Sequence, residues 1–167
     1  AAAIAQMERF VVDLGRMYHE RNEALREVTR AHHEVLLRLA LAADFRDDDT
    51  GVHMVRIGCL AERLALLLGK PPAFAAMLRR AAPMHDVGKI GIPENILLKP
   101  GALSAEETRI MRTHVGMGED IVAGAGWLAG GQAVVAGHHE KWDGSGYPDG
   151  LRGEDIHLYG RIGAVAD

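Results

Sequence analysis

Histidine and aspartate residues recur along this chain in a pattern that its fold must bring to one place. A His-Asp pair stands at positions 85–86, with one histidine before it at 53 and another after it at 114. A His-His pair follows at 138–139, and one more aspartate stands at 167. Five imidazoles and two carboxylates without a thiolate suit a cluster of two or three divalent ions rather than structural zinc. The set consists of His53, His85, Asp86, His114, His138, His139 and Asp167.

The two dipeptides of this set suggest how the ions are shared. His85 and Asp86 fall where a predicted helix ends, so that both neighbouring side chains can reach one site. A carboxylate can bridge two ions about 3.5–4 Å apart, whereas an imidazole cannot. We therefore expect Asp86 to bridge the ions and His85 to be a terminal ligand. The His138-His139 pair has the same geometry and can supply two ions separately. A single His-Asp or His-His dipeptide can occur by chance in an unrelated sequence, so the predicted metal site depends on the joint occurrence of all members of the set.

The composition limits the classes of partner. The chain has 167 residues, 48% of them hydrophobic and 5% aromatic, which predicts one domain with an aliphatic core and an appended helix. A net charge of −4 offers no basic excess for a nucleic-acid duplex or an anionic membrane. We expect no secretory signal and no membrane contact, and hence a cytoplasmic location. The single cysteine, Cys59, lies in an apolar run and is expected to be buried.

The segment from position 1 to position 43 carries a heptad pattern that predicts one long helix, or two nearly continuous ones. Before about Val28 we expect a two-stranded coiled coil and therefore a homodimer. The alternative is an ordinary amphipathic helix that packs on its own domain, which we favour after about Leu36. We assign residues 1–40 to a signalling helix and 41–167 to the globular domain. The apolar heptad positions are Ile4, Met7, Val11, Leu14, Tyr18, Leu25, Val28, Val35 and Leu39.

The remaining chain predicts an all-α fold. Helices are expected over residues 51–68, 73–85, 104–123 and 131–141, and from about 160 onward. Ser104 followed by Glu107 is a capping box that opens one of them. No strand-like alternation of any length is visible.

Two segments resemble the signature motifs of the HD-GYP subfamily of HD metal-dependent phosphohydrolases. They are H-D-V-G-K-I-G-I-P at 85–93 and H-H-E-K-W-D-G-S-G-Y-P-D-G-L at 138–151. The resemblance covers residues from about 40 to 167 and implies a compact helical bundle around two or three metal ions. It also implies hydrolysis of the bacterial second messenger cyclic di-GMP to linear pGpG, and in many members on to GMP.

The resemblance also implies roles for individual residues. By position, the family's metal ligands fall on the seven residues of the set above, and its substrate-phosphate lysine falls on Lys89. The metals are typically iron or manganese, with nickel, cobalt, zinc and magnesium as other candidates. Members with three ions use a glutamate four residues before the first histidine, where this chain has Asp49. Asp49 is therefore either a ligand of a third ion or a cap in a solvated acidic turn.

The loop at 144–148 has two interpretations that do not exclude each other. Gly144 and Gly146 allow positive φ and Pro148 fixes φ, which predicts a stiff loop at the rim of the active site. The resemblance also implies a surface for partner proteins, including GGDEF-type cyclases. We expect Tyr147 and Trp142 to serve packing rather than base stacking.

Together these features predict a phosphodiesterase in which a hydroxide bridging two ions attacks phosphorus, with Lys89 on the phosphate. A different HD phosphohydrolase is disfavoured by the 144–148 loop and the second histidine pair. A catalytically silent binding module is disfavoured because all ligand positions are filled. A purely structural signalling helix fits only the segment 1–40. Family members continue past the position of Asp167, so we expect the 41–167 domain to be incomplete at its C-terminal end.

Overall fold

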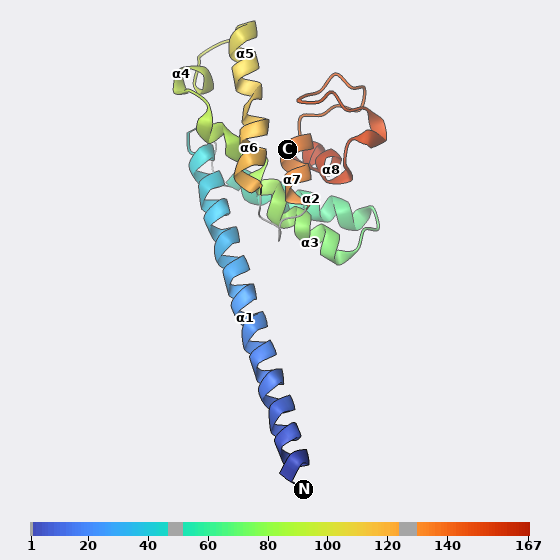
Figure 1. Cartoon of the computed structure of the whole chain (residues 1–167). Coiled ribbons are helices and arrows are strands. Elements are labelled where there is room, and N and C mark those ends of the chain that lie inside the picture. The colour runs from blue at the N-terminus through green and yellow to red at the C-terminus, as the bar shows by residue number, and fades with distance from the viewer. Residues whose placement is uncertain (1, 47–51, 124–129) are drawn as a thin grey trace. The chain divides into compact units, whose positions relative to one another are not determined.

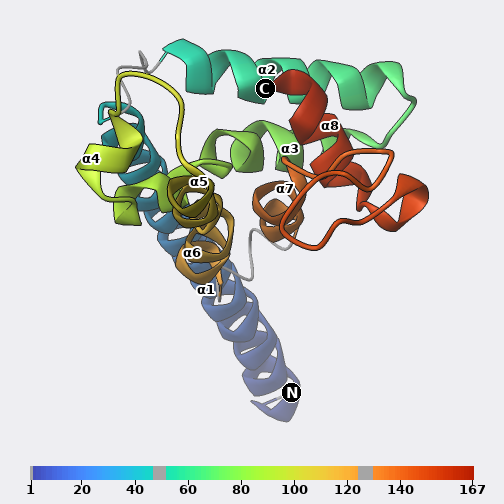
Figure 2. The same cartoon turned by 90° about the horizontal axis from the view of Figure 1, so that it is seen from above.

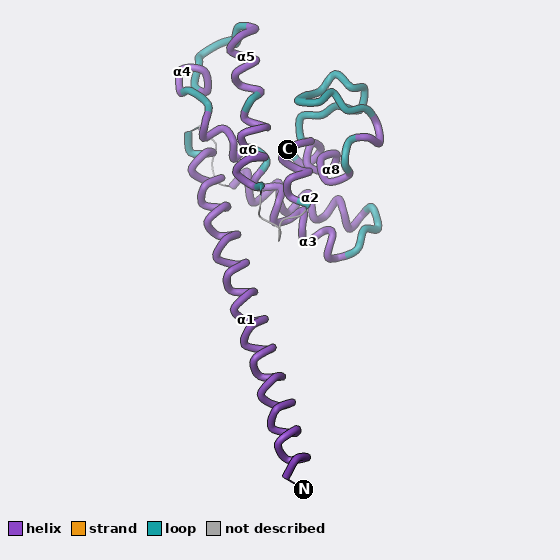
Figure 3. Tube along the Cα trace, in the orientation of Figure 1, coloured by secondary structure: helices purple, strands orange, loops and turns teal. Residues whose placement is uncertain are grey.

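The computed structural model describes residues 2–46, 52–123 and 130–167. Within these ranges every regular element is a helix, and no strand occurs (Figure 3). The all-α prediction is therefore confirmed. The described residues divide into two compact units, one that ends at Val35 and one that begins at Leu36. No described helix is long and apolar enough to span a membrane.

The helices follow the predicted order with local differences. The expected helix over 73–85 changes to a tighter 3-10 turn at residue 82, because Pro83 lacks the N–H that an α-helix needs. The expected helix over 104–123 is split at Thr113. The elements are α1 (Ala2–Asp44), α2 (Val52–Leu67), α3 (Pro72–Ala81), η1 (Ala82–Met84), η2 (Val87–Gly91), α4 (Glu94–Leu97), α5 (Ala105–Arg112), α6 (His114–Val122), α7 (Gly131–Gly137), η4 (Gly153–Asp155) and α8 (Leu158–Ala166) (Figure 1).

The first unit is the N-terminal part of α1. The seven apolar heptad positions from Ile4 to Val28 are each more than half exposed. A continuous helix with an exposed apolar face is the form that the heptad pattern predicts.

The second unit buries an aliphatic core. Helix α2 packs on α3 and α8, and α7 packs on α8 and α6 (Figure 2). Met54, Ile57, Leu78, Met84 and Val134 are among its fully buried side chains. This composition is the one expected from the low aromatic content.

Cys59 departs from the prediction, because it is exposed on α2. The buried face of that helix is formed by Met54, Ile57, Gly58, Ala61 and Ala65. Cys59 lies on another face, where its sulfur accepts a hydrogen bond from Arg79 at 3.3 Å.

Helix α5 begins with the predicted capping box. The Ser104 hydroxyl accepts from the Glu107 backbone N–H, and the Glu107 carboxylate accepts from the Ser104 N–H. An ion pair of 2.6 Å with Lys99 lowers the pKa of Glu107 to about 2. The cap fixes where α5 starts, and α5 leads directly into α6.

Close backbone approach is needed where η2 meets α6. A Cβ atom at Gly88 would collide with the carbonyl oxygen of His114 and would lie 2.5 Å from the backbone nitrogen of Gly118. Only glycine lets the segment after the His-Asp pair lie this close to the helix that carries His114.

We predict that Gly88→Ala destabilises the fold by about 3 kcal/mol, because a rigid backbone must move to admit the methyl group. The measurement is the free energy of unfolding from denaturant titration followed by circular dichroism. Gly116→Ala is the matched control, since nothing lies within 4 Å of a Cβ there. It is expected to stabilise α6 by up to about 1 kcal/mol. Equal stability of the two variants would refute the close packing.

Candidate metal centre

Helix ends carry every residue of the predicted ligand set. His53 is the second residue of α2, and His114 is the first residue of α6. The others directly follow or join short helices: His85 follows η1, Asp86 precedes η2, His138 and His139 follow α7, and Asp167 follows α8.

The donor atoms of these seven residues converge into two groups. Within each group, one donor atom from every residue lies within 4.8 Å of the others. His138 and His139 both fall in the first group rather than one in each. The first group is Asp86, His114, His138 and His139, and the second is His53, His85 and Asp167.

Asp86 lies between the two groups. Its Oδ1 is 3.2 Å from Nε2 of His114 and 3.6 Å from Nε2 of His138. Its Oδ2 is 3.2 Å from Nε2 of His85, which belongs to the second group. The two oxygens of one carboxylate therefore face different groups, as a bridging ligand requires.

Backbone hydrogen bonds orient three of the imidazoles. Nδ1 of His85, His114 and His138 each lies 2.7–2.9 Å from the carbonyl oxygen three residues earlier. A carbonyl only accepts, so Nδ1 carries the proton and Nε2 presents its lone pair to the centre. This is the tautomer that a metal-binding histidine needs.

The converging lone pairs call for a cation. Nε2 of His114 and Nε2 of His138 are only 3.4 Å apart, and with their protons on Nδ1 they cannot bond to each other. Nε2 of His85 and Oδ1 of Asp86 are buried and have no hydrogen-bond partner among the described residues. Unsatisfied buried acceptors of this kind are costly unless a cation lies among them. The residues therefore fit divalent metal ions.

The electrostatics of the centre agree with this conclusion. Burial by itself would lower the pKa of His85, but the carboxylates of Asp167 and Asp86, 3.4 and 3.2 Å from its Nε2, raise that pKa to about 10. The carboxylates of Asp86 and Asp167 therefore favour a positive charge beside them, whether a proton on His85 or a metal ion. Burial lowers the pKa of His139 to about 3, helped by the neighbouring imidazoles, so this side chain is neutral and able to donate its lone pair.

Lys89 lies at the edge of the centre. It is on η2, three residues after Asp86, and its Nζ is 2.9 Å from Asp86 Oδ2. The cation that the sequence associates with a substrate phosphate is therefore in contact with the central carboxylate.

The loop at 144–148 packs against the first group. The Tyr147 ring stacks on the His139 ring with centroids 4.6 Å apart, in agreement with a packing role. Gly144 has a φ of 80°, as expected. Gly146 serves another purpose, because its Cβ would lie 2.6 Å from the carbonyl oxygen of His139. Trp142 is 62% exposed, and the guanidinium carbon of Arg161 lies 5.7 Å from the centroid of its ring, so its packing role stays a prediction.

Two residues that the sequence analysis overlooked hold this region in place. Glu140 is buried, and its Oε1 accepts from the backbone N–H groups of Asp149 at 2.8 Å and Gly150 at 3.0 Å. It thereby closes the loop. Arg46, after α1, donates to the carbonyl oxygens of Lys89, Ile90 and Ile92 at 2.6–3.3 Å. The position of Glu140 next to His139 is the one feature of the sequence that points to a role for it. Nothing in the sequence around Arg46 indicates its contact with the distant segment 89–92.

Asp49, the candidate ligand of a third ion, lies outside the described residues. Its two interpretations both stay predictions.

Comparison with known proteins extends these observations. A family model described as HD domain matches residues 18–167. A 3'3'-cGAMP-specific phosphodiesterase 2 of Vibrio cholerae is 45% identical over 145 residues, which are 86% of this chain and 27% of the relative. A cyclic di-GMP phosphodiesterase of Thermotoga maritima is 45% identical over 136 residues, 80% of this chain and 37% of the relative.

A third relative is a cyclic di-GMP phosphodiesterase response regulator of Xanthomonas campestris. It is 41% identical over 146 residues, 86% of this chain and 39% of the relative. The chain thus spans between 27% and 39% of the length of these three proteins. With the HD match over most of its length and both signature motifs present, the chain belongs to the HD-GYP branch of the HD domain family.

Proposed function

We propose that this chain is the catalytic part of a metal-dependent phosphodiesterase that hydrolyses cyclic di-GMP to linear pGpG in the cytoplasm. The observation that carries the proposal is the position of Asp86, whose two oxygens face two groups of donor atoms. A site of this kind would hold two ions, and two-ion sites are common in phosphodiester-cleaving enzymes. The names of the relatives support a cyclic dinucleotide as the substrate.

We assign His114, His138 and His139 to one ion and His53, His85 and Asp167 to a second ion. Asp86 would be a ligand of both ions. Iron or manganese is our choice, because imidazole and carboxylate ligands without thiolate suit them. When bound, the ions would supply Lewis acidity, which acidifies a water molecule and neutralises charge on phosphate oxygens. A third ion, with Asp49 among its ligands, is a further proposal.

The protein's own residues prepare the site for this reaction. A hydrogen bond from Nδ1 to a backbone carbonyl fixes the orientation of each of three imidazoles, so these rings need little reorganisation when a metal ion binds. Lys89 contributes a cation for the phosphate that is attacked. Water adds to the phosphorus, the bond to the 3′ oxygen breaks, and that oxygen leaves with a proton. The product carries a 5′ phosphate, and a second such step would give GMP.

A second candidate substrate is 3'3'-cGAMP, because a relative of 45% identity is named for it. It differs from cyclic di-GMP in one purine base. The same centre can cleave either phosphodiester, so the contacts to the base decide between them.

The first test is anaerobic incubation of the manganese- or iron-loaded protein with each cyclic dinucleotide, followed by chromatography of the products. We expect linear pGpG or GMP from cyclic di-GMP with the parent protein and none with Asp86→Asn. Exclusive cleavage of 3'3'-cGAMP would replace the first substrate by the second. No product from either nucleotide with a fully metallated protein would contradict the proposal.

We also predict that Asp86→Ala abolishes turnover and removes at least one bound ion, because both groups lose a shared carboxylate. Metal content is measured by elemental analysis after dialysis. Asp120→Ala, an exposed aspartate on α6, is the control and is expected to retain the parent's metal content. Full occupancy and activity in Asp86→Ala would exclude the bridging assignment.

We propose further that the protein is a homodimer through α1 and that the loop at 144–148 receives a GGDEF-type partner. The exposed heptad face supports the first, since an apolar face of this length in water favours a second helix. Exposure of Pro148 and of the nearby Trp142 supports the second.

The dimer is tested by two neighbouring substitutions. Val11 occupies a heptad position and Val12 does not, although the two are 60% and 70% exposed. We expect Val11→Glu to shift the mass measured by light scattering toward the monomer, because it places a charge in the seam. Val12→Glu should stay dimeric. A monomeric parent, or equal effects of the two substitutions, would reject the coiled-coil dimer.

A further inference from the structure

The cations near the metal centre are not equally available to a substrate. Lys89 Nζ lies 2.9 Å from Asp86 Oδ2, so part of its charge compensates the centre itself. A cyclic dinucleotide has two phosphate groups and carries two negative charges at neutral pH. Because the chain as a whole is acidic, with a net charge of −4, the second phosphate needs its own placed cation.

Arg112 lies beside the first group of donor residues without belonging to it. It is the last residue of α5, and its guanidinium carbon is 4.7 Å from the centroid of the Tyr147 ring. The same ring stacks on His139 at 4.6 Å and meets the His114 ring edge-on at 6.5 Å. One aromatic ring thus separates this cation from two candidate metal ligands.

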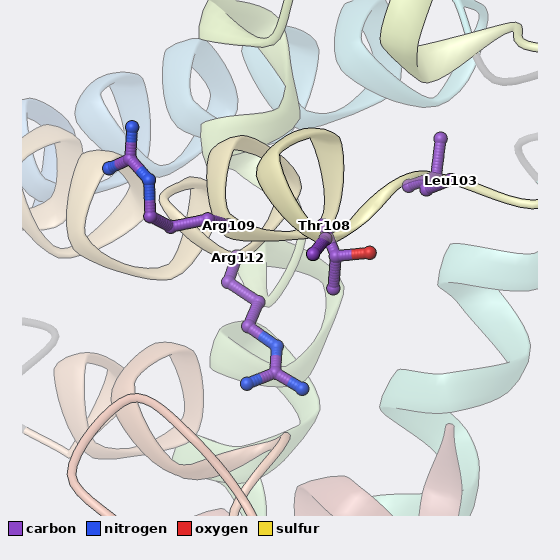
Figure 4. Close-up of a pocket in the computed structure, with 5 residues that line it drawn as sticks. Leu103, Thr108, Arg109 and Arg112 are labelled. Atoms are coloured by element: carbon purple, nitrogen blue, oxygen red, sulfur yellow. The ribbon is translucent and has the colours of Figure 1, made fainter.

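The N–H groups of Arg112 are available to a ligand. In the described part of the chain its guanidinium makes no ion pair or hydrogen bond, and only the contact with Tyr147 holds it. Packing against a ring face fixes an arginine while leaving its five donors unused. Arg109, one turn earlier, differs because Glu106 binds it through hydrogen bonds of 2.6 and 3.0 Å. The two arginine side chains leave α5 in different directions (Figure 4).

A hollow of about 380 Å³ lies next to Arg112. Its walls combine apolar side chains, one hydroxyl group and the arginines, and Figure 4 shows Leu103 and Thr108 on the side away from Arg109. The volume is in the range of small-molecule sites, roughly 300–1,000 Å³. The lining residues are Leu103, Ala105, Thr108, Arg109 and Arg112.

We propose that Arg112 binds the phosphate of the cyclic dinucleotide that is not being cleaved, with the attached nucleoside in the hollow beside it. This inference rests on the proposed function. Lys89 contacts Oδ2 of Asp86, and Oδ1 of the same carboxylate faces His114. The His114 ring meets the Tyr147 ring, which in turn contacts the guanidinium group of Arg112. The two cations therefore reach the centre through different side chains, so each can contact a different phosphate of one substrate.

The test compares a substrate that has two phosphates with one that has a single phosphate. Hydrolysis of cyclic di-GMP and of bis(p-nitrophenyl) phosphate is measured with the manganese-loaded parent, Arg112→Ala, Arg112→Lys and Arg80→Ala. We expect Arg112→Ala to lower kcat/KM for cyclic di-GMP roughly tenfold to a hundredfold, mainly through KM. This loss should exceed that on the simple diester by about tenfold or more. Arg112→Lys should recover part of it, and Arg80→Ala, at an exposed arginine of α3, should have a much smaller effect.

Calorimetry provides a readout that does not depend on turnover. The affinity of the metal-loaded protein for cyclic di-GMP or pGpG should weaken in Arg112→Ala by a factor similar to the loss in kcat/KM, at unchanged metal content. An equal loss on both diesters, or a loss of metal, would mean that Arg112 only supports Tyr147 and His139, and would overturn the proposal. An unchanged affinity would overturn it as well.

Failure of the proposed function gives a different result. A parent protein that cleaves the simple diester but neither binds nor cleaves a cyclic dinucleotide contradicts the substrate itself. A parent that binds cyclic di-GMP without cleaving it still tests Arg112 through the calorimetric comparison.

Discussion

One largely enclosed carboxylate, with 15% of its side chain exposed, organises the candidate metal centre. Asp86 turns one oxygen toward His114 and His138 and the other toward His85 and Lys89. A charge can be removed from water at tolerable cost only when it is surrounded by compensating partners. Burial alone would raise the pKa of Asp86, but the positive charge that collects among the surrounding imidazoles holds that pKa far below its usual range. The ends of η1, α6 and α7, which carry His85, His114 and His138, therefore meet around this one group.

Bringing helix ends together requires close contact between backbones. A Cβ on Gly160 of α8 would lie 2.9 Å from Cα of Gly137 in α7, so the two helices meet at bare backbone. Gly137 directly precedes the histidine pair, and α8 ends just before Asp167. Gly88 lets η2 approach α6 in the same way. Small residues thus set the spacing between elements, and the spacing sets the distances between donor atoms.

Around the donor atoms, a second set of residues fixes loops by means of backbone hydrogen bonds. Glu140 closes the loop that carries Tyr147, and Arg46 holds the carbonyl oxygens of Lys89 and Ile90. These contacts join segments that are distant in sequence or belong to irregular loops. They pre-organise the rim of the centre, where the proposed substrate contacts of Lys89 and Arg112 lie.

The sequence by itself determined the all-α class, the approximate helices, the capping box at Ser104 and the seven residues that converge. Helical periodicity and caps depend on neighbours within one or two turns, and metal chemistry restricts the residue types, so both are visible in a linear pattern. Only the tertiary structure decided the two-group arrangement, the exposure of Cys59 and the roles of Glu140 and Arg46. These depend on which distant surfaces meet, and no local pattern records the atoms on the other side of a contact.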